Sequence, residues 1–202
     1  MELEFSKGRI IFEKELSFLD KLVFEFTAIL DKQKINYVVV SGYIAILFGR
    51  SRNTEDIDLF IEEMPLKKFL EFWNELYAQG FECLNTSNPE EAFNDYLKEK
   101  LAVRFALKGS FEPNFEVKFP KTDLNWYSLK NKLVVEINKE KLNISKIELQ
   151  IPFKLYLGSD KDIEDAIHLW EIFKDRLNIE LFNGFIERLK VGKKINLLEG
   201  KT

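Results

Sequence analysis

The sequence predicts an α+β fold, in which a mixed, twisted sheet with flanking helices precedes a C-terminal helical part. Over residues 1–144, short apolar runs bounded by turn residues alternate with stretches of helical periodicity. From residue 145 to residue 202 the helical periodicity alone remains. We therefore expect an α/β core over 1–144, with a sheet of about four or five strands, and a helical subdomain over 145–202.

The composition is that of a folded protein rather than a disordered chain. Hydrophobic residues make up 46% of the sequence and charged residues 32%, and the 19 phenylalanines are expected mostly in the core. The formal net charge of −4 argues against a general nucleic-acid binder and leaves a local basic site open.

The N-terminus and the single cysteine restrict the setting of the protein. The first stretch, MELEFSKGRIIFEKE, is too charged for a secretory signal. The sequence has no apolar run long enough for a membrane-spanning helix. Cys83 is the only cysteine, which excludes an intrachain disulfide. We expect a cytoplasmic protein without a membrane partner.

The first predicted elements are a helix and a buried strand. Residues 9–33 carry an apolar stripe of helical spacing, which predicts a helix packed on the sheet. The strand Tyr37–Val40 follows, then a Ser41-Gly42 turn and a short helix, Tyr43–Phe48. A polar loop then leads to a second strand. The stripe consists of Leu16, Leu19, Val23, Phe26 and Leu30.

The middle of the chain continues the alternation of helices and strands. Pro65 predicts the start of a helix that ends near Gln79, with Gly80 as the residue that follows its C-cap. Further strands are expected at 81–84, 101–107 and 115–119, and a short acidic helix at 90–99.

Capping signals mark the helices that follow. Ser145 with Glu148, and Ser159 with Asp162, resemble capping boxes. Pro152 could kink or delay the first of these two helices. The other elements expected here are a helix over 123–130 with Thr122 as its N-cap, strands over 133–137 and 142–144, and a last helix over 179–191.

Two aspartates with one residue between them begin the strand Asp56–Ile61. Alternate side chains of a strand share a face, so Asp56 and Asp58 point the same way, and Ile57 and Leu59 the other. Like charges on one face repel, and strands disfavour Asp. Oxygen ligands suit Mg²⁺, so the pair suggests a cation between the carboxylates. The alternative is a solvated polar face on an edge strand.

This stretch resembles the signature of a known family. Val40-Ser41-Gly42, a gap of thirteen residues and Asp56-Ile57-Asp58-Leu59 resemble the nucleotidyltransferase fold of the DNA polymerase beta superfamily. The loop GRSRNTEDID is similar to that of small stand-alone nucleotidyltransferases, including toxins of abortive-infection type. Ser41 departs from the pattern, which usually has Gly there. The resemblance implies a nucleotidyltransferase-like sheet and a nucleotidyltransferase activity.

The resemblance also implies a metal site and a nucleotide substrate. Asp56 and Asp58 would hold Mg²⁺ or Mn²⁺ for an NTP substrate, and a third carboxylate would lie on a later strand beside them. Glu116 is in the right order along the chain, although Asp is commoner at this place in the family. The alternative is an ordinary surface Glu next to Lys118.

The turn and the loop after it are candidates for phosphate binding. Backbone N–H groups at Ser41 and Gly42 could face a triphosphate, although a strand-to-helix turn favours Gly in any case. Arg50, Arg52 and Thr54 are the loop residues that could contact phosphate, since Arg binds it bidentately. The alternative for the loop is a solvated segment that pairs with nearby glutamates, Glu55, Glu62 or Glu63.

The helical part resembles the end of these enzymes at which a Lys and a downstream Asp complete the site. Lys154 lies among apolar residues and would neutralise developing charge. Asp162 borders the apolar stripe of its helix, whereas Asp165 lies further from it, so Asp162 is the preferred acidic residue. The alternatives are a surface Lys with a buried stem and a helix-capping Asp.

Two functions from different classes remain in view. The first is Mg²⁺-dependent transfer of a nucleoside monophosphate from an NTP to an acceptor hydroxyl of a small molecule, a protein or a tRNA. The second is a nucleotide- or partner-binding module that kept the fold without catalysis. The departures from the family pattern at Ser41 and Glu116 favour this alternative. An antitoxin-like partner protein would belong to this second class.

Overall fold

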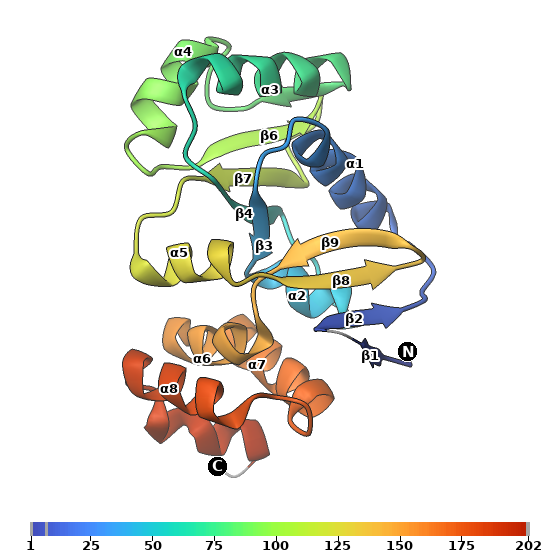
Figure 1. Ribbon diagram of the computed structural model, residues 1–202, viewed down its shortest axis with the longest axis vertical. Helices are drawn as coiled ribbons and strands as arrows, with labels where there is room; N and C mark the ends of the chain where they lie inside the picture. Colours follow the sequence, from blue (N-terminus) through green and yellow to red (C-terminus); the bar gives the residue numbers. More distant parts are fainter. Residues whose placement is uncertain (1, 7, 201–202) are drawn as a thin grey trace.

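One sheet runs through the protein, and it is larger than the sequence predicts. The computed structural model describes residues 2–6 and 8–200, in which nine strands form a single mixed sheet (Figure 1). The strand order is β1-β2-β8-β9-β3-β4-β7-β6-β5. The α+β class is confirmed, whereas the expected number of strands is too low. The strands are β1 Glu4–Ser6, β2 Arg9–Phe12, β3 Tyr37–Val40, β4 Asp56–Ile61, β5 Phe81–Cys83, β6 Val103–Leu107, β7 Asn114–Lys118, β8 Leu133–Ile137 and β9 Glu140–Ile144.

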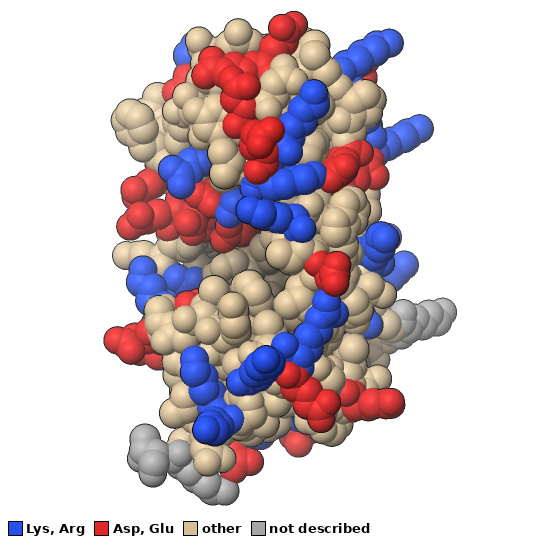
Figure 2. Space-filling view, turned by 90° about the vertical axis from the view of Figure 1, so that its left-hand side faces the viewer, with Lys and Arg blue, Asp and Glu red and all other residues tan. Residues whose placement is uncertain are grey.

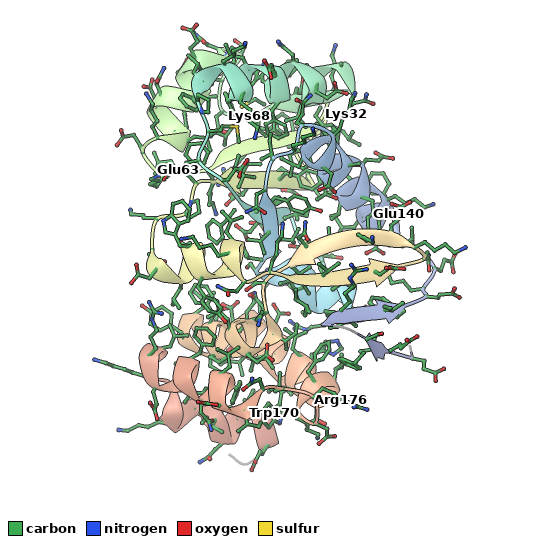
Figure 3. All side chains as sticks on the ribbon, viewed as in Figure 1. Lys32, Glu63, Lys68, Glu140, Trp170 and Arg176 are labelled. Atoms are coloured by element: carbon green, nitrogen blue, oxygen red, sulfur yellow. The ribbon has the colours of Figure 1, made fainter. Side chains whose placement is uncertain are left out.

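Helices flank the sheet and form the C-terminal end of the molecule. In Figure 1, α3 and α4 lie at the top, and α6, α7 and α8 lie together at the bottom. Figure 3 marks the two ends with Lys68 on α3 and Trp170 on α7. Across residues 2–6 and 8–200, every helix is too short or too polar to span a membrane. The helices are α1 Phe18–Lys32, α2 Gly42–Leu47, α3 Leu66–Ala78, α4 Pro89–Glu91, the π-helix η1 Ala92–Leu97, α5 Asp123–Lys130, α6 Ile147–Leu157, α7 Asp160–Phe173, α8 Ile179–Leu189 and the 3₁₀ helix η2 Gly192–Glu199.

Aromatic side chains fill the core between the sheet and its helices, as the phenylalanine content predicts. The rings of Phe26 on α1 and Phe115 on β7 stack with centroids 3.9 Å apart. Phe81 and Phe105 pack around the same ring of Phe26, at 5.3 Å and 6.3 Å. Because β7 turns Phe115 and Val117 into this core, its alternate residues must face away from it.

The N-terminal residues overturn one prediction. The expected helix over 9–33 begins only at Phe18, and β2 precedes it. Ile10 and Phe12 of β2 are buried with 3% exposure each, and β2 pairs in parallel with β8. The helix begins after Ser17, whose side chain accepts a hydrogen bond from the backbone N–H of Asp20 in a capping box. Residues 9–12 therefore form a strand, and the helix covers only the later part of the predicted range.

The capping predictions have mixed outcomes. Thr122 caps α5 and Ser159 caps α7, each accepting a hydrogen bond from the third helical N–H. The box predicted at Ser145 is wrong, because α6 begins at Ile147 and no side chain caps it. Ser145 is instead buried with its hydroxyl 3.3 Å from that of Ser128, and Pro152 lies inside α6.

Candidate active site at the centre of the sheet

The two aspartates of β4 lie on the face of the strand that points away from the core. Asp56 and Asp58 are half-buried, whereas Ile57 and Leu59 are fully buried. The apolar residues fix this orientation, since turning the strand over would bury both carboxylates. The structure thus places Asp56 and Asp58 on one face, as the sequence predicts.

Glu116 joins the aspartates through the pairing of two central strands. β4 and β7 run in parallel, and the register sets Asp58 directly opposite Glu116 and Asp56 opposite Asn114. Glu116 is half-buried on the same face of β7, because Phe115 and Val117 occupy the core. Two segments far apart in the chain therefore bring three carboxylates together.

The electrostatics of this cluster show the cost of collecting acidic groups. Burial raises the pKa of Asp58, and the charges of Asp56 and Glu116 raise it further, against the lowering effect of Lys118. The pKa of Glu116 is lowered, because hydrogen bonds and charge from Lys118 and Arg104 outweigh burial. Burial thus outweighs the neighbouring cation at Asp58, whereas the cations outweigh burial at Glu116.

Two basic side chains already hold these carboxylates. Lys118 Nζ lies 2.8 Å from Asp58 Oδ1 and 2.7 Å from Glu116 Oε2. Arg104 Nη2 lies 2.7 Å from Glu116 Oε1. Within the described residues no group of three or more His, Cys, Asp or Glu is arranged as a ready-made metal site. The oxygen donors suit Mg²⁺ or Mn²⁺ chemically, but an ammonium group lies between two of them.

The Ser41-Gly42 turn lies next to the cluster and has an unusual backbone. Ser41 has φ 66° and ψ −138°, a conformation that residues other than Gly rarely adopt. Gln150 Nε2 donates a hydrogen bond of 3.4 Å to the Ser41 carbonyl, which ties α6 to the turn. The helix α2 that starts here has only six residues, so its own dipole adds little to a phosphate site.

A cavity of about 200 Å³ opens between the sheet, α5 and α6. It joins the carboxylate cluster to the turn, because Asp58, Lys118 and Ser41 all line it. Figure 2, which shows the side of the molecule that faces left in Figure 1, has a hollow near its middle. The other lining residues are Val40, Phe60, Leu124, Asn125, Ser128, Leu149, Gln150 and Phe153.

A second hollow of about 370 Å³ lies on the other side of the carboxylates. Asp56, Glu116 and Arg104 line it, and the exposed ring of Phe111 stands at it. The carboxylate cluster therefore separates two hollows. The remaining lining residues are Glu55, Leu84, Asn85, Glu112 and Asn114.

The two arginines of the loop pair with acidic residues of α7 rather than with the nearby glutamates. Arg50 and Arg52 both bind the carboxylate of Asp165 on α7, and the Arg52 Nε lies 3.1 Å from it. Neither guanidinium pairs with Glu55, Glu62 or Glu63 in the described structure. Arg52 also lies against the turn, since a Cβ added to Gly42 would come 1.9 Å from its Nη2.

Thr54, the last of the loop candidates, contacts the cluster directly. Its hydroxyl donates a hydrogen bond of 2.9 Å to the backbone carbonyl of Asp56 and lies 3.4 Å from the Asp56 carboxylate. Thr54 therefore orients the start of β4.

Lys154 is buried, as expected, but it faces acidic residues of its own helical region rather than the aspartates of β4. Its Nζ lies 2.7 Å from Asp162 and 2.9 Å from Asp165. The expected position of Asp165 away from the buried face of its helix is wrong, because Asp165 is completely buried and binds three cations. The choice of Asp162 as the acidic site residue stays a prediction. The apolar stripe of α7 does not reveal this burial, since α7 packs on both α2 and α6 and so buries more than its stripe. Arg50, Arg52 and Lys154 are three cations that require acidic partners once they are buried, and this requirement is the signal in the sequence for a buried acid.

Comparison with known proteins gives a fold and no sequence match. No family model matches the chain, and neither does a curated protein. An antigenic nucleotidyltransferase-like protein from Paracoccidioides brasiliensis superposes with a TM-score of 0.55 at 18% identity, over 90% of this chain and 92% of that one. ANT(2″)-Ia in complex with adenylyl-2″-tobramycin superposes with 0.53 at 15% identity, over 85% and 99%. A solution structure of ANT(2″)-Ia gives 0.54 at 14% identity, over 89% and 94%. The chain thus has a nucleotidyltransferase-like fold.

Proposed function

We propose that this protein is a nucleotidyltransferase that moves a nucleoside monophosphate from an NTP to a hydroxyl group of a small acceptor, releasing pyrophosphate. The observation that carries the proposal is the register of β4 and β7, which sets Glu116 opposite Asp58, next to the cavity that contains Ser41. The fold shared with ANT(2″)-Ia supports it, because that protein is seen with an adenylylated small molecule.

Mg²⁺, or Mn²⁺ in its place, is the cofactor we propose. Asp56, Asp58 and Glu116 offer the oxygen ligands that these ions prefer. A cation would also stabilise the ionised form of Asp58, against the burial and the repulsion that raise its pKa. When bound, the metal would supply polarisation of the phosphoryl group and a lower pKa for the acceptor hydroxyl.

The two hollows suggest separate places for donor and acceptor. We assign the NTP to the cavity beside Ser41, where backbone N–H groups can meet phosphate and Phe60 and Phe153 can pack on the nucleoside. We assign the acceptor to the hollow beside Asp56 and Glu116. Its lining contains four carboxylates and one arginine, which favours an acceptor with positive charge.

The residues around Asp165 serve as positioning residues in this proposal. Lys154, Asp162 and Arg50 are tied to one another through ion pairs and do not reach the carboxylates of β4. Arg52 is the cation beside Gly42, and its contact with Asp165 holds the helical part against the turn. Direct neutralisation of developing charge by Lys154 is not part of the proposal.

The test is pyrophosphate release from ATP and Mg²⁺ with a panel of cationic, hydroxyl-bearing small molecules. We expect release with at least one acceptor, and its loss in Asp56→Asn and Asp58→Asn. Asp123→Asn serves as the control, because the Asp123 side chain is 91% exposed on α5. Undiminished release in folded Asp58→Asn would contradict the proposed role of the cluster.

A nucleotide-binding module without catalysis is the second candidate. The ammonium group of Lys118 between Asp58 and Glu116 favours it, because this group lies where a metal would be needed. Calorimetric binding of ATP without pyrophosphate release for any acceptor would support this candidate. No observation on the described residues favours an antitoxin-like protein or tRNA as the partner.

A further inference from the structure

A lysine bridges the two strands that carry the proposed metal ligands. Lys118 Nζ lies 2.8 Å from Asp58 Oδ1 and 2.7 Å from Glu116 Oε2. The side chains of Asp58 and Glu116 are 21% and 12% exposed, while that of Lys118 is 28% exposed. One ammonium group therefore neutralises two poorly hydrated carboxylates at once.

The alternation of β7 places Lys118 in this position. Glu116 and Lys118 are two residues apart and share a face, while Phe115 and Val117 point into the core. The parallel register sets Lys118 opposite Phe60, two residues beyond Asp58. The flexible four-carbon stem then reaches back along the face to both carboxylates.

We propose that Lys118 is a built-in counter-ion, which competes with a divalent cation for Asp58 and Glu116 and leaves both carboxylates when the metal binds. The proposal takes its metal from the proposed function, but it does not depend on nucleotidyl transfer. It accounts for why the carboxylates converge without forming a ready-made metal site.

Two physical arguments support the exchange. First, an ammonium group and a divalent cation repel strongly at close range, so both cannot bind the same pair of oxygens. Second, the Lys118 side chain can move into the 200 Å³ cavity beside Ser41, because it already lines that cavity. Arg104 differs, since it contacts Glu116 from the other hollow and does not bridge the strands.

The experiment measures Mn²⁺ binding by calorimetry with the full chain and without nucleotide. We expect Lys118→Met to bind Mn²⁺ about tenfold more tightly than the wild type, because a unit of competing charge is removed. Lys118→Arg keeps the charge and should bind Mn²⁺ as weakly as the wild type. Lys121→Met, three residues along the chain, is the control for loss of a lysine outside the cluster and should leave the affinity unchanged.

A second measurement uses the wild type alone, so the result does not depend on whether a variant folds. Lysine acylation followed by mass spectrometry reports how free each ammonium group is. We expect saturating Mg²⁺ to increase the labelling of Lys118 several-fold and to leave the labelling of Lys121 unchanged. A metal that binds without changing the labelling of Lys118 would overturn the exchange.

The outcomes separate this inference from the proposed function. Tighter Mn²⁺ binding by Lys118→Met, in a protein that never releases pyrophosphate, would uphold the counter-ion and refute the transferase. Equal Mn²⁺ affinities of Lys118→Met and wild type, in a protein that transfers nucleotides, would refute the counter-ion alone. Failure of both proteins to bind Mn²⁺ would also refute it.

Discussion

Two clusters of charged side chains meet at the Ser41-Gly42 turn, and they differ in their access to water and in their balance of charge. We call the first the open cluster, because it lies between two hollows. The second, the closed cluster, surrounds the fully buried Asp165. The open cluster consists of Asp56, Asp58, Glu116, Arg104 and Lys118. The closed cluster consists of Asp165, Asp162, Arg50, Arg52 and Lys154.

The ion pairs of the closed cluster stabilise the fold, whereas the carboxylates of the open cluster are available to bind another cation. In the closed cluster, hydrogen bonds from Lys154 and Ser159 outweigh burial and lower the pKa of Asp162. In the open cluster, Lys118 and Arg104 lower the pKa of Glu116, but burial and neighbouring carboxylates still raise that of Asp58. The closed cluster is therefore complete within the chain, whereas the open cluster gains from an added cation.

The largest expected effect comes from removing the central charge of the closed cluster. Asp165→Asn leaves Arg50, Arg52 and Lys154 without their shared partner, and we expect the free energy of unfolding to fall by about 3–5 kcal/mol. Urea unfolding followed by tryptophan fluorescence measures it. Asp58→Asn is the matched change in the open cluster and should cost far less, since the pKa of Asp58 is already raised.

The neighbouring Glu164 supplies a control for the closed cluster. Its side chain is 65% exposed although it also contacts Arg50, so Glu164→Gln should change the free energy of unfolding by less than about 0.5 kcal/mol. Equal losses for Asp165→Asn and Asp58→Asn would remove the distinction between the clusters.

A smaller effect is expected where the closed cluster presses on the turn. A Cβ at Gly42 would meet Arg52 Nη2 at 1.9 Å, and Arg52 cannot yield freely because Asp165 holds it. We expect Gly42→Ala to lower the free energy of unfolding by about 1–3 kcal/mol. Gly184→Ala, in α8 with open space around it, should instead stabilise by about 0.5–1 kcal/mol. A harmless Gly42→Ala would mean that Arg52 is free to move.

The pH dependence of stability tests the closed cluster in another way. The lowered pKa of Asp162 means that its ionised form stabilises the fold at pH values above the unfolded pKa of 3.8, and that this contribution disappears as pH falls through the folded pKa. At pH 7 we expect Asp162→Asn to be less stable than the wild type by about 1 kcal/mol. Chemical unfolding at several pH values should show the two proteins converging in acid. A difference that persists at pH 2 would contradict the ion pair as its source.

The smallest expected effect is at the turn between the clusters. Ser41 has a backbone conformation that suits Gly, so Ser41→Gly should relieve strain. The greater freedom of Gly in the unfolded chain offsets part of this gain. We expect a net increase in the free energy of unfolding of about 0.5–1 kcal/mol, measured by urea unfolding. A loss of stability would show that the Ser41 side chain contributes a contact of its own.

The sequence predicts the carboxylates of the open cluster far better than the central acid of the closed one. Asp56 and Asp58 follow from the alternation of a single strand, and Glu116 from the alternation of a second one together with the family resemblance. Asp165 depends on how α7 packs against distant elements, which periodicity along one helix does not encode. For the same reason the sequence does not reveal the strand β2, because its partner β8 lies more than a hundred residues away along the chain.

The parallel register of β4 and β7 couples the core to the chemistry of the site. A one-residue slip of β7 would turn Phe115 and Val117 to the solvent and bury Glu116 and Lys118. The stacking of Phe115 on Phe26 therefore fixes the register that sets Glu116 opposite Asp58. An insertion or deletion within β7 would therefore prevent folding as well as disrupt the site. The loop over 108–113, in contrast, can change length without changing the alignment of Glu116 with Asp58.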